Sequence, residues 1–196
     1  MATAYVFDDI LLQGVRSGQV PARTRAARTW YREKAKETTS ATQTKLISDK
    51  ERLRTRLLPG TMVFFTYDPK TKAKLPFYDR FPLTVIIDVT SDGFTGLNLH
   101  YLPYVQRAKL MDALYTISNN KKFDETTRIR ATYKTLQGAA KFASFKPCFK
   151  RYLNGHLRSK FLYVNPSEWD IALFLPVENF KKSGKSKVWT DSLSKV

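Results

Sequence analysis

The stretch PGTMVFFTYDPKTKAKLPFYDRFPLTVIIDVTSDGFTGLNLHYLP, residues 59–103, decides the fold class because it combines strand-like runs with turn residues. Its runs 62–67, 83–89 and 94–99 are rich in β-branched and aromatic residues and are bounded by Pro, Gly, Asp and Asn. This composition is typical of strands joined by turns. We therefore expect a small, bent antiparallel sheet here, either open or closed into an SH3-like barrel.

The segment before this sheet predicts basic amphipathic helices, which makes the chain α+β. Four cations between Arg25 and Lys36 follow one another at spacings of 3, 4 and 4, so that a helix would place them on one face. A second helix is expected to follow the Thr/Ser-rich segment 38–44 and to stop at Pro59. The apolar segment 5–12 predicts a further short helix, packed on the domain or used as a docking arm.

Further helices are expected within residues 103–162. One begins after Pro103, one covers 124–142 with Asp124 as its N-cap, and one begins at Pro147. The apolar run at about 169–176 then predicts a final strand that rejoins the sheet at about 60–102 and closes a barrel.

This pattern divides the chain into three parts, which its length assigns to one domain. Residues 1–58 form N-terminal basic helical arms, residues 59–180 form the central sheet or barrel with its inserted helices, and residues 181–196 form a mobile basic tail. Charged residues are distributed unevenly along the chain: residues 59–105 carry four basic and four acidic side chains, whereas residues 106–164 carry 13 basic and three acidic ones.

The net charge indicates a polyanionic partner. The chain of 196 residues carries 34 Lys and Arg against 17 Asp and Glu, a formal charge of +17. Such an excess is typical of proteins that bind nucleic acid. Two alternatives stay open, since a cationic helix face can be merely solvated and a lysine-rich loop can serve to block edge pairing.

The composition argues against several other classes. Cys148 is the one cysteine, and together with His100 and His156 it gives no spacing typical of zinc ligands. Asp68, Asp79, Asp88 and Asp92 are candidate metal-binding carboxylates, although Asp68 and Asp92 occupy turn sequences that favour Asp for local hydrogen bonds. We therefore expect that the protein is not an enzyme and that it binds neither a cofactor nor a small-molecule ligand. No apolar run approaches the roughly 18–20 residues of a membrane span, and the N-terminus is unlike a signal peptide, so we expect no membrane association.

Basic and aromatic residues that lie close together in the sequence are the candidate binding residues. The candidate DNA-binding residues are Arg25, Arg28, Arg32, Lys36, Lys70, Lys72, Lys74, Arg130, Lys134, Lys150, Arg151 and Arg158. The candidate partner-binding residues are Trp30, Phe77, Tyr78, Phe81 and Trp189. Aromatic residues beside cations can stack on bases, but such a cluster is more often core or a protein contact.

Three sequence motifs resemble one known family. PGTMVFFTYDPKTKAKLPFYDRFPL (59–83), GLNLHYLP (96–103) and the upstream WYREKAK (30–36) resemble the DNA end protector family of T-even-type contractile-tailed bacteriophages, over about residues 25–115. The resemblance implies a virion protein that caps the ends of linear double-stranded DNA and shields them from host exonuclease. It implies no catalytic residue, and it places the protein in the virion and in the host cytoplasm during assembly and after genome entry.

Two functions from different classes therefore stand side by side. The first is non-enzymatic binding of DNA ends, mainly through the phosphate backbone. The second is a structural role in the neck, tail or baseplate of the phage particle, with other virion proteins as partners. RNA binding is a third possibility that has the charge in its favour and no recognition motif.

Overall fold

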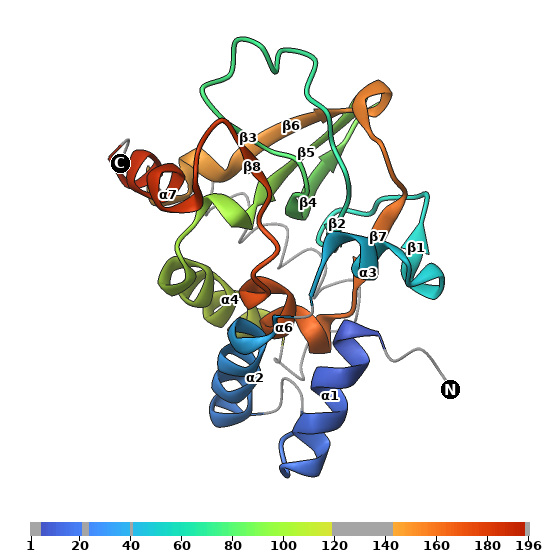
Figure 1. Cartoon of the computed structure of the whole chain (residues 1–196), viewed down its shortest axis with the longest axis vertical. Coiled ribbons are helices and arrows are strands. Elements are labelled where there is room, and N and C mark those ends of the chain that lie inside the picture. Colours follow the sequence, from blue (N-terminus) through green and yellow to red (C-terminus); the bar gives the residue numbers. More distant parts are fainter. Residues whose placement is uncertain (1–4, 21–23, 40, 119–142, 195–196) are drawn as a thin grey trace.

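An open antiparallel sheet of six strands forms the centre of the fold (Figure 1). The computed structural model describes residues 5–20, 24–39, 41–118 and 143–194. The strand order is β1-β7-β2-β4-β5-β6, and β1 and β6 are the two edges, so within the described residues the sheet does not close into a barrel. The strands are β1 (Leu53–Arg54), β2 (Met62–Phe64), β4 (Leu83–Val89), β5 (Gly93–Asn98), β6 (Phe149–Leu153) and β7 (Phe161–Val164), and a separate two-stranded ribbon joins β3 (Tyr78–Asp79) to β8 (Phe180–Lys181).

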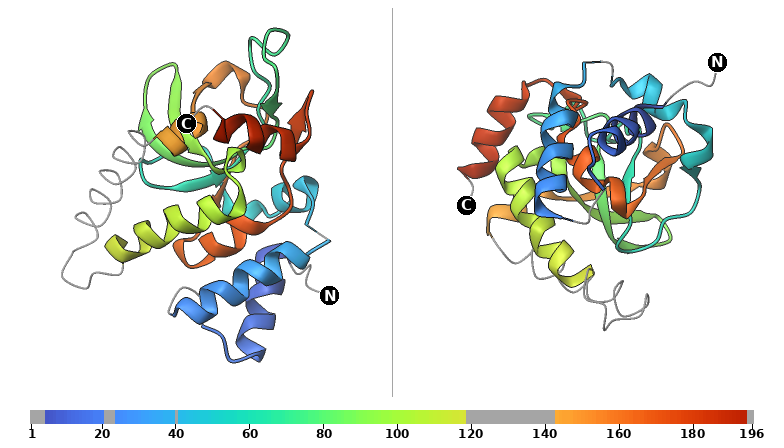
Figure 2. Two further views of the ribbon diagram at one scale, coloured as in Figure 1. Left: turned by 90° about the vertical axis from the view of Figure 1, so that its left-hand side faces the viewer. Right: turned by 90° about the horizontal axis from the view of Figure 1, so that it is seen from below.

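Most of the helices gather at one end of the molecule, away from the long connection between β2 and β3 (Figures 1 and 2). The helices are α1 (Val6–Arg16), α2 (Arg25–Glu37), α3 (Gln43–Ile47), α4 (Tyr104–Ser118), α6 (Trp169–Phe174) and α7 (Lys185–Leu193), with 3-10 turns η1 (Lys50–Arg52), η2 (Leu99–Tyr101), η3 (Ala143–Cys148), η4 (Asn154–His156) and η5 (Pro166–Glu168). Among the described residues, no helix has both the length and the apolar character needed to cross a membrane. The predicted α+β class is confirmed, and so are a helix near residue 5, strands close to 83–89 and 94–99, and a helix after Pro103.

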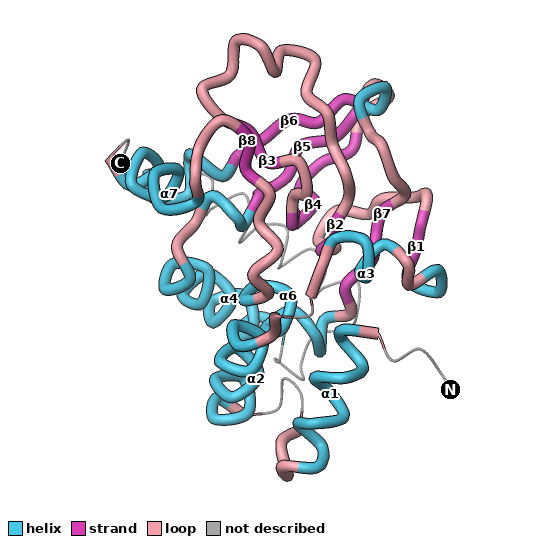
Figure 3. The backbone as a smooth tube through the Cα atoms, viewed as in Figure 1, coloured by secondary structure: helices cyan, strands magenta, loops and turns pink. Residues whose placement is uncertain are grey.

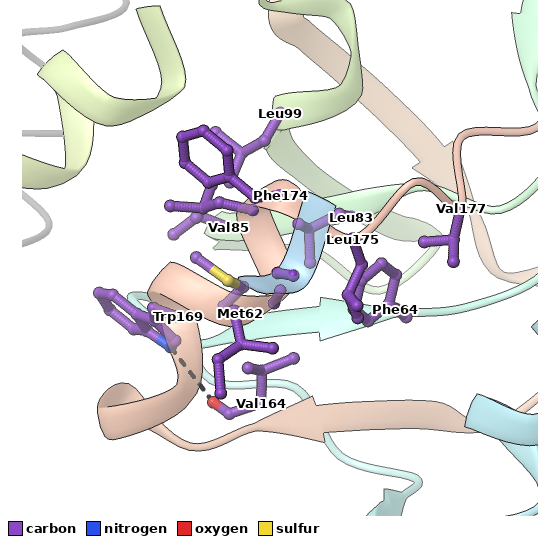
Figure 4. Close-up of a cluster of buried hydrophobic side chains, with 14 of the residues drawn as sticks. Met62, Phe64, Leu83, Val85, Leu99, Val164, Trp169, Phe174, Leu175 and Val177 are labelled. Atoms are coloured by element: carbon purple, nitrogen blue, oxygen red, sulfur yellow. Dashed lines mark hydrogen bonds between the residues drawn. The ribbon is translucent and has the colours of Figure 1, made fainter. Parts of the chain in front are cut away.

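Both faces of the sheet are covered, because side chains alternate between the two faces along each strand. On one face, Met62, Phe64 and Val85 pack against the buried helix α6 (Figure 4). On the other face, Phe65 stands at the centre of an aromatic cluster, with its ring centroid 5.0 Å from that of Tyr152 and 5.4 Å from that of Phe94. Apolar contact on both sides explains why the central strands carry few polar residues.

The final strand predicted at about 169–176 is wrong, because this segment is helix α6. All six residues of α6 are buried, so the run is apolar on every side, and periodicity alone cannot distinguish a buried helix from a buried strand. The local start signal is helical: Pro166 opens the preceding turn, and the backbone N–H of Asn165 donates to Glu168 Oε2 at 3.2 Å.

The helix predicted from Pro147 is also wrong, since the segment forms β6, η4 and β7. Within β6 the exposed Arg151 is followed by the buried Tyr152, as expected where successive side chains of a strand point to opposite faces of the sheet. Close pairing with β5 depends on Gly93, where an added Cβ would lie 1.9 Å from the carbonyl oxygen of Tyr152. The prediction for 124–142 lies outside the described residues.

The second N-terminal helix is much shorter than predicted. Helix α3 ends at Ile47, and the chain turns through η1 into the edge strand β1. Arg52 fixes this turn, because its guanidinium pairs with Asp49, Glu168 and Asp8. These ion pairs join η1 to α1 and η5, and they override the helical preference of the isolated segment.

The predicted mobile tail is wrong for residues 181–194, which belong to the packed structure. Residues 185–193 form α7, in which Val188 is fully buried. The indole Nε1 of Trp189 donates to the carbonyl oxygen of His100 at 2.7 Å. The C-terminal helix is therefore anchored on η2.

A fully buried arginine, Arg107, joins four parts of the fold. Its guanidinium donates to the carbonyl oxygens of Leu102 (2.8 Å), Leu173 (2.6 Å) and His100 (3.3 Å), and to Glu178 Oε1 (2.8 Å). Burial by itself raises the pKa of the Glu178 carboxyl, but electrostatic interactions with His100 and Arg107 lower it below the usual value. Helix α4, η2, α6 and the segment before β8 are thus held by one buried ion pair.

Replacing Glu178 by Gln should weaken this buried network and change how stability depends on pH. Because the folded-state pKa is below the unfolded value, the stabilisation is complete above the ordinary Glu pKa of about 4.3 and is lost as the pH falls through the folded-state pKa. We expect Glu178→Gln to lower the free energy of unfolding at pH 7 by about 3 kcal/mol, because Arg107 then lacks its charge partner. Urea unfolding followed between pH 7 and pH 3 measures both effects.

The matched control is Glu51→Gln, which removes an exposed carboxylate. This variant should follow the wild-type curve closely. If Glu178→Gln lost stability below about pH 4.3 as steeply as the wild type, Glu178 would not be the titrating group.

Candidate nucleic-acid interface

The connection between β2 and β3, residues 65–77, lies beside the β6–β7 connection, although about 80 residues separate them in the sequence. The two segments are joined by backbone hydrogen bonds from Asp68 to His156 (3.0 Å) and from Arg158 to Thr66 (2.9 Å). The Tyr67 hydroxyl also accepts from the backbone N–H of Leu153 at 3.1 Å. Figure 3 shows residues 65–77 as a long loop at the end of the molecule opposite α2.

Lys182 holds this loop in place. Its ammonium group donates to the carbonyl oxygens of Lys72 (2.7 Å), Ala73 (2.9 Å) and Leu75 (2.9 Å), which uses all three donors of a lysine. Lys182 has a positive φ of 67°, which is uncommon for a residue with a side chain. The turn after β8 thus aims this side chain at the loop.

A cleft of about 550 Å³ opens between the loop and the sheet. Tyr67, Tyr101, Tyr152, Asp79 and Asn98 are buried residues of its lining and form its interior, while exposed residues such as Lys70 form its rim. The full lining consists of Tyr67, Pro69, Lys70, Thr71, Leu75, Phe77, Asp79, Asn98, Tyr101, Lys150, Arg151, Tyr152 and Leu153. The cleft therefore combines aromatic residues with cations contributed by two distant segments.

The interior of the cleft carries aromatic hydroxyls and one satisfied carboxylate. Burial raises the pKa of Tyr67, Tyr101 and Tyr152, so these phenols stay neutral at physiological pH. The Asp79 carboxylate accepts from the backbone N–H of Phe81 (3.0 Å) and from Asn98 Nδ2 (3.2 Å). His100 Nδ1 lies 2.7 Å from Asp79 Oδ2.

Cations surround the cleft. Lys150 Nζ lies 4.1 Å from the centroid of the Tyr101 ring, a cation–π contact that holds it at the cleft wall. Lys70 and Lys74 are exposed on the loop. The hydrogen bond from Lys72, together with the charges of Lys72, Arg158 and Arg80, lowers the pKa of Asp68, so Arg158 acts on the same part of the surface as the loop lysines.

The structure thus brings together two of the predicted basic groups, the loop lysines Lys70, Lys72 and Lys74 and the group of Lys150, Arg151 and Arg158. Arg151 Nη2 on β6 lies 2.6 Å from Oδ2 of Asp92 in the turn between β4 and β5, and the two form an exposed ion pair. Arg130 and Lys134 lie outside the described residues.

The cations of α2 occupy a different place. Arg32 is buried, and its guanidinium pairs with Asp170 (2.6 Å) and Asp112 (2.8 Å). Arg28 also pairs with Asp112 (3.1 Å), and Lys36 pairs with Glu33. These ion pairs turn the cationic face of α2 toward α4 and α6, while Arg25 remains exposed. Helix α2 lies at the end of the molecule opposite the loop (Figure 1).

The aromatic candidates divide between core and cleft. Phe81 is fully buried and stacked on Phe64, with ring centroids 5.2 Å apart, so it presents no surface to a partner in this conformation. Trp30 packs edge-on against Tyr31 within the helical layer. Trp189 anchors α7, as described above, whereas Phe77 lines the cleft.

Tyr78 is the remaining aromatic candidate and lies half-buried on β3, where it pairs with Lys181. Sequence reasoning missed Lys182 and the three tyrosines of the cleft. The motifs YDP and HYLP, which contain Tyr67 and Tyr101, are visible in the sequence. The sequence does not show that their side chains face the cleft, because this depends on how the strands pair.

The candidate carboxylates of the sequence do not gather at a common metal site within the described residues. No three His, Cys, Asp or Glu side chains converge there on a site for a metal ion. The Asp79 carboxylate accepts hydrogen bonds from Phe81 and Asn98. Asp88 is exposed at the end of β4, and Asp92 accepts a hydrogen bond from the Thr90 hydroxyl. Burial raises the pKa of the Cys148 thiol to about 12, which keeps it protonated at neutral pH.

Replacing Arg32 by Met should destabilise the fold. The substitution would leave the buried Asp170 without its guanidinium partner, and removing one member of a buried pair costs about 3–5 kcal/mol. Urea unfolding at pH 7 measures the change. Arg25→Met on the same helix removes an exposed cation and should change stability by less than about 0.5 kcal/mol. Equal unfolding midpoints for the two variants would contradict the structural role of Arg32.

Replacing Lys182 by Met should loosen the loop without unfolding the protein. Three carbonyl oxygens would lose their common donor, so the loop lysines should become better trypsin sites. Limited trypsin digestion with mass spectrometry should show faster first cleavage after Lys70, Lys72 or Lys74. Lys187→Met, which removes an exposed lysine of α7, serves as the control. Unchanged cleavage in Lys182→Met would show that the loop is held by other contacts.

Comparison with known proteins confirms the resemblance found in the sequence motifs. The family model of the phage T4 terminal DNA protecting protein matches residues 8–193. The match extends the resemblance from about residues 25–115 into the C-terminal third, including β6, β7 and α7. No curated protein and no solved structure matches the chain. Because the match covers nearly all of the 196 residues, the protein belongs to the phage T4 terminal DNA protecting protein family.

Proposed function

We propose that the protein binds the ends of linear double-stranded DNA through the loop 65–77 and the neighbouring β6–β7 segment, without catalysing a reaction. The observation that carries this proposal is that the loop of the exposed Lys70 and Lys74 is joined by backbone hydrogen bonds to the segment of Arg158, next to an aromatic cleft. Lysine and arginine at such a surface neutralise phosphates and release counterions, which supplies most of the affinity for DNA. The family supports the choice of DNA ends over other polyanions.

Protection then follows from occupancy of the end. An exonuclease must reach the terminal phosphodiester bonds, so a protein bound across the terminus blocks it sterically. This role needs no active site, in keeping with the paired states of Asp79 and Asp92. The protein would act in the virion, on packaged DNA, and in the host cytoplasm after genome entry.

The distribution of cations favours the loop end of the molecule over α2 as the DNA surface. Arg28 and Arg32 are engaged with Asp112 and Asp170, and phosphate binding there would have to break ion pairs that hold the helical layer. Lys70 and Lys74 are exposed on the loop. The ammonium group of Lys182 holds this loop by donating to backbone carbonyl oxygens of the loop, and these contacts do not involve the side chains of Lys70 and Lys74. Their side chains can therefore meet phosphates at little cost in stability.

A structural role in the neck, tail or baseplate is the second candidate. One observation favours it: Leu12 and Val15 of α1 are 50% and 64% exposed, and exposed apolar side chains can mark a protein contact. In that case the affinity for DNA would show no preference for ends, which the following experiment measures.

Replacing Lys70, Lys74 and Arg158 together by Gln should weaken end binding and reduce its dependence on salt. The slope of log K against log salt changes by about 0.9 for each phosphate contact, so the loss of three contacts should flatten it by up to about 3. Binding is measured by competition between a linear duplex and a closed circle of the same sequence, from low to physiological salt. Wild-type protein should prefer the linear form and protect it from a processive exonuclease.

The matched control replaces three exposed cations elsewhere, Arg16, Arg25 and Lys45, by Gln. This variant has the same net charge as the first, so a general effect of charge would flatten both slopes equally. A flatter slope in the control alone would move the DNA surface to the helical end. Equal affinity of the wild type for linear and circular DNA would overturn end binding.

A further inference from the structure

The cleft beside the loop has two chemically different zones. Its interior is aromatic, with Tyr67, Tyr101 and Tyr152 each 4–6% exposed. Its rim is cationic, with Lys70 and Arg151 exposed at the surface. A ligand that fits both zones has a planar, uncharged part and a negatively charged part.

The interior does not suit a phosphate group. The Asp79 side chain is only 1% exposed and lies in the cleft lining. A second anion beside this carboxylate would be repelled, since the repulsion between like charges at short range is poorly screened in a buried site. The negatively charged part of the ligand must therefore stay at the rim.

The interior does suit a nucleobase. Its volume of about 550 Å³ lies within the range of about 300–1,000 Å³ typical of small-molecule sites. Aromatic rings stack on any base, because every base has a π-face.

Phe77 is the wall residue best placed for such stacking. It is half-buried and lines the cleft, and its ring centroid lies 6.1 Å from that of Tyr101. The backbone of the adjacent loop is fixed by Lys182, so the wall is formed before a ligand arrives. Pre-formed stacking surfaces lower the ordering cost of binding.

Bases inside a duplex cannot enter such a cleft, because they are paired and stacked on both sides. We propose that the cleft binds the base of an unpaired nucleotide at the terminus of duplex DNA, while the rim cations bind the adjoining phosphates. This inference rests on the proposed function and deepens it, since it names the part of the DNA end that the protein recognises. It also gives a physical reason for a preference for ends over internal duplex.

The test compares three labelled DNAs: a duplex with one hairpin-closed end and one blunt end, the same duplex with two unpaired nucleotides at the open end, and the single strand alone. Wild-type protein should bind the duplex with unpaired nucleotides roughly tenfold more tightly than the blunt duplex, the effect of one stacked base. With the fluorescent base 2-aminopurine at the unpaired position, binding should quench its fluorescence, and at an internal paired position it should not.

Phe77→Leu should abolish the advantage of the unpaired nucleotides, so that its affinity for the duplex with unpaired nucleotides falls to its affinity for the blunt duplex. Phe145→Leu, which changes a half-buried phenylalanine outside the cleft lining, should keep that advantage. Circular dichroism checks the fold of both variants. If Phe77→Leu did not fold, quenching in the wild type would still decide the question.

Equal binding of the blunt duplex and the duplex with unpaired nucleotides, without quenching, would overturn this inference. The proposed function would survive that result if both duplexes still outcompeted a closed circle, and it would fail if neither did. Single strand that bound as tightly as the duplex with unpaired nucleotides would overturn recognition of a duplex terminus.

Discussion

The buried guanidinium of Arg107 is the interaction on which the arrangement of the fold depends. It contacts the carbonyl oxygens of η2 and α6 and pairs with Glu178, two residues before β8. Burial of a charge is unfavourable unless hydrogen bonds and an opposite charge compensate it, and here both are present. The chain then runs through β8 to Lys182, whose ammonium group fixes the loop above the cleft. The position of the candidate site thus follows from a charge buried in the core.

The excess of positive charge has two separate uses in this protein. Arg32, Arg52 and Arg107 are largely buried and act as internal ties, because one guanidinium can bridge several helices at once. Lys70, Lys74 and Arg158 are exposed and leave their charge available to solvent. The loop between β2 and β3, which carries the two lysines, lies at the opposite end of the molecule from α2 (Figure 1). A count of basic residues cannot separate these uses, although the choice of arginine for the internal ties and mainly lysine for the loop agrees with their chemistry.

The candidate site depends on contact between distant segments. Residues 65–77 supply the loop and one tyrosine, η2 supplies Tyr101, and β6 supplies Lys150 and Tyr152. These parts meet because β6 pairs with β5 in a fixed register, Phe94 opposite Tyr152 and Gly96 opposite Lys150. A shift of one residue would turn Lys150 and Tyr152 to the other face of the sheet and remove them from the cleft.

The sequence by itself determined the α+β class, the strands at 83–89 and 93–98, helices α1, α2 and α4, and the family, because alternation, helical spacing and distinctive motifs are local signals. Only the tertiary structure decided that 169–174 is a helix and that 149–153 and 161–164 are strands, since a short apolar or mixed run fits either state until its neighbours are known. It also decided which cations are exposed and which are held in buried ion pairs. In the sequence, Arg32 and Lys70 are both basic residues within basic segments. In the structure they differ, because the buried carboxylate of Asp170 pairs with Arg32.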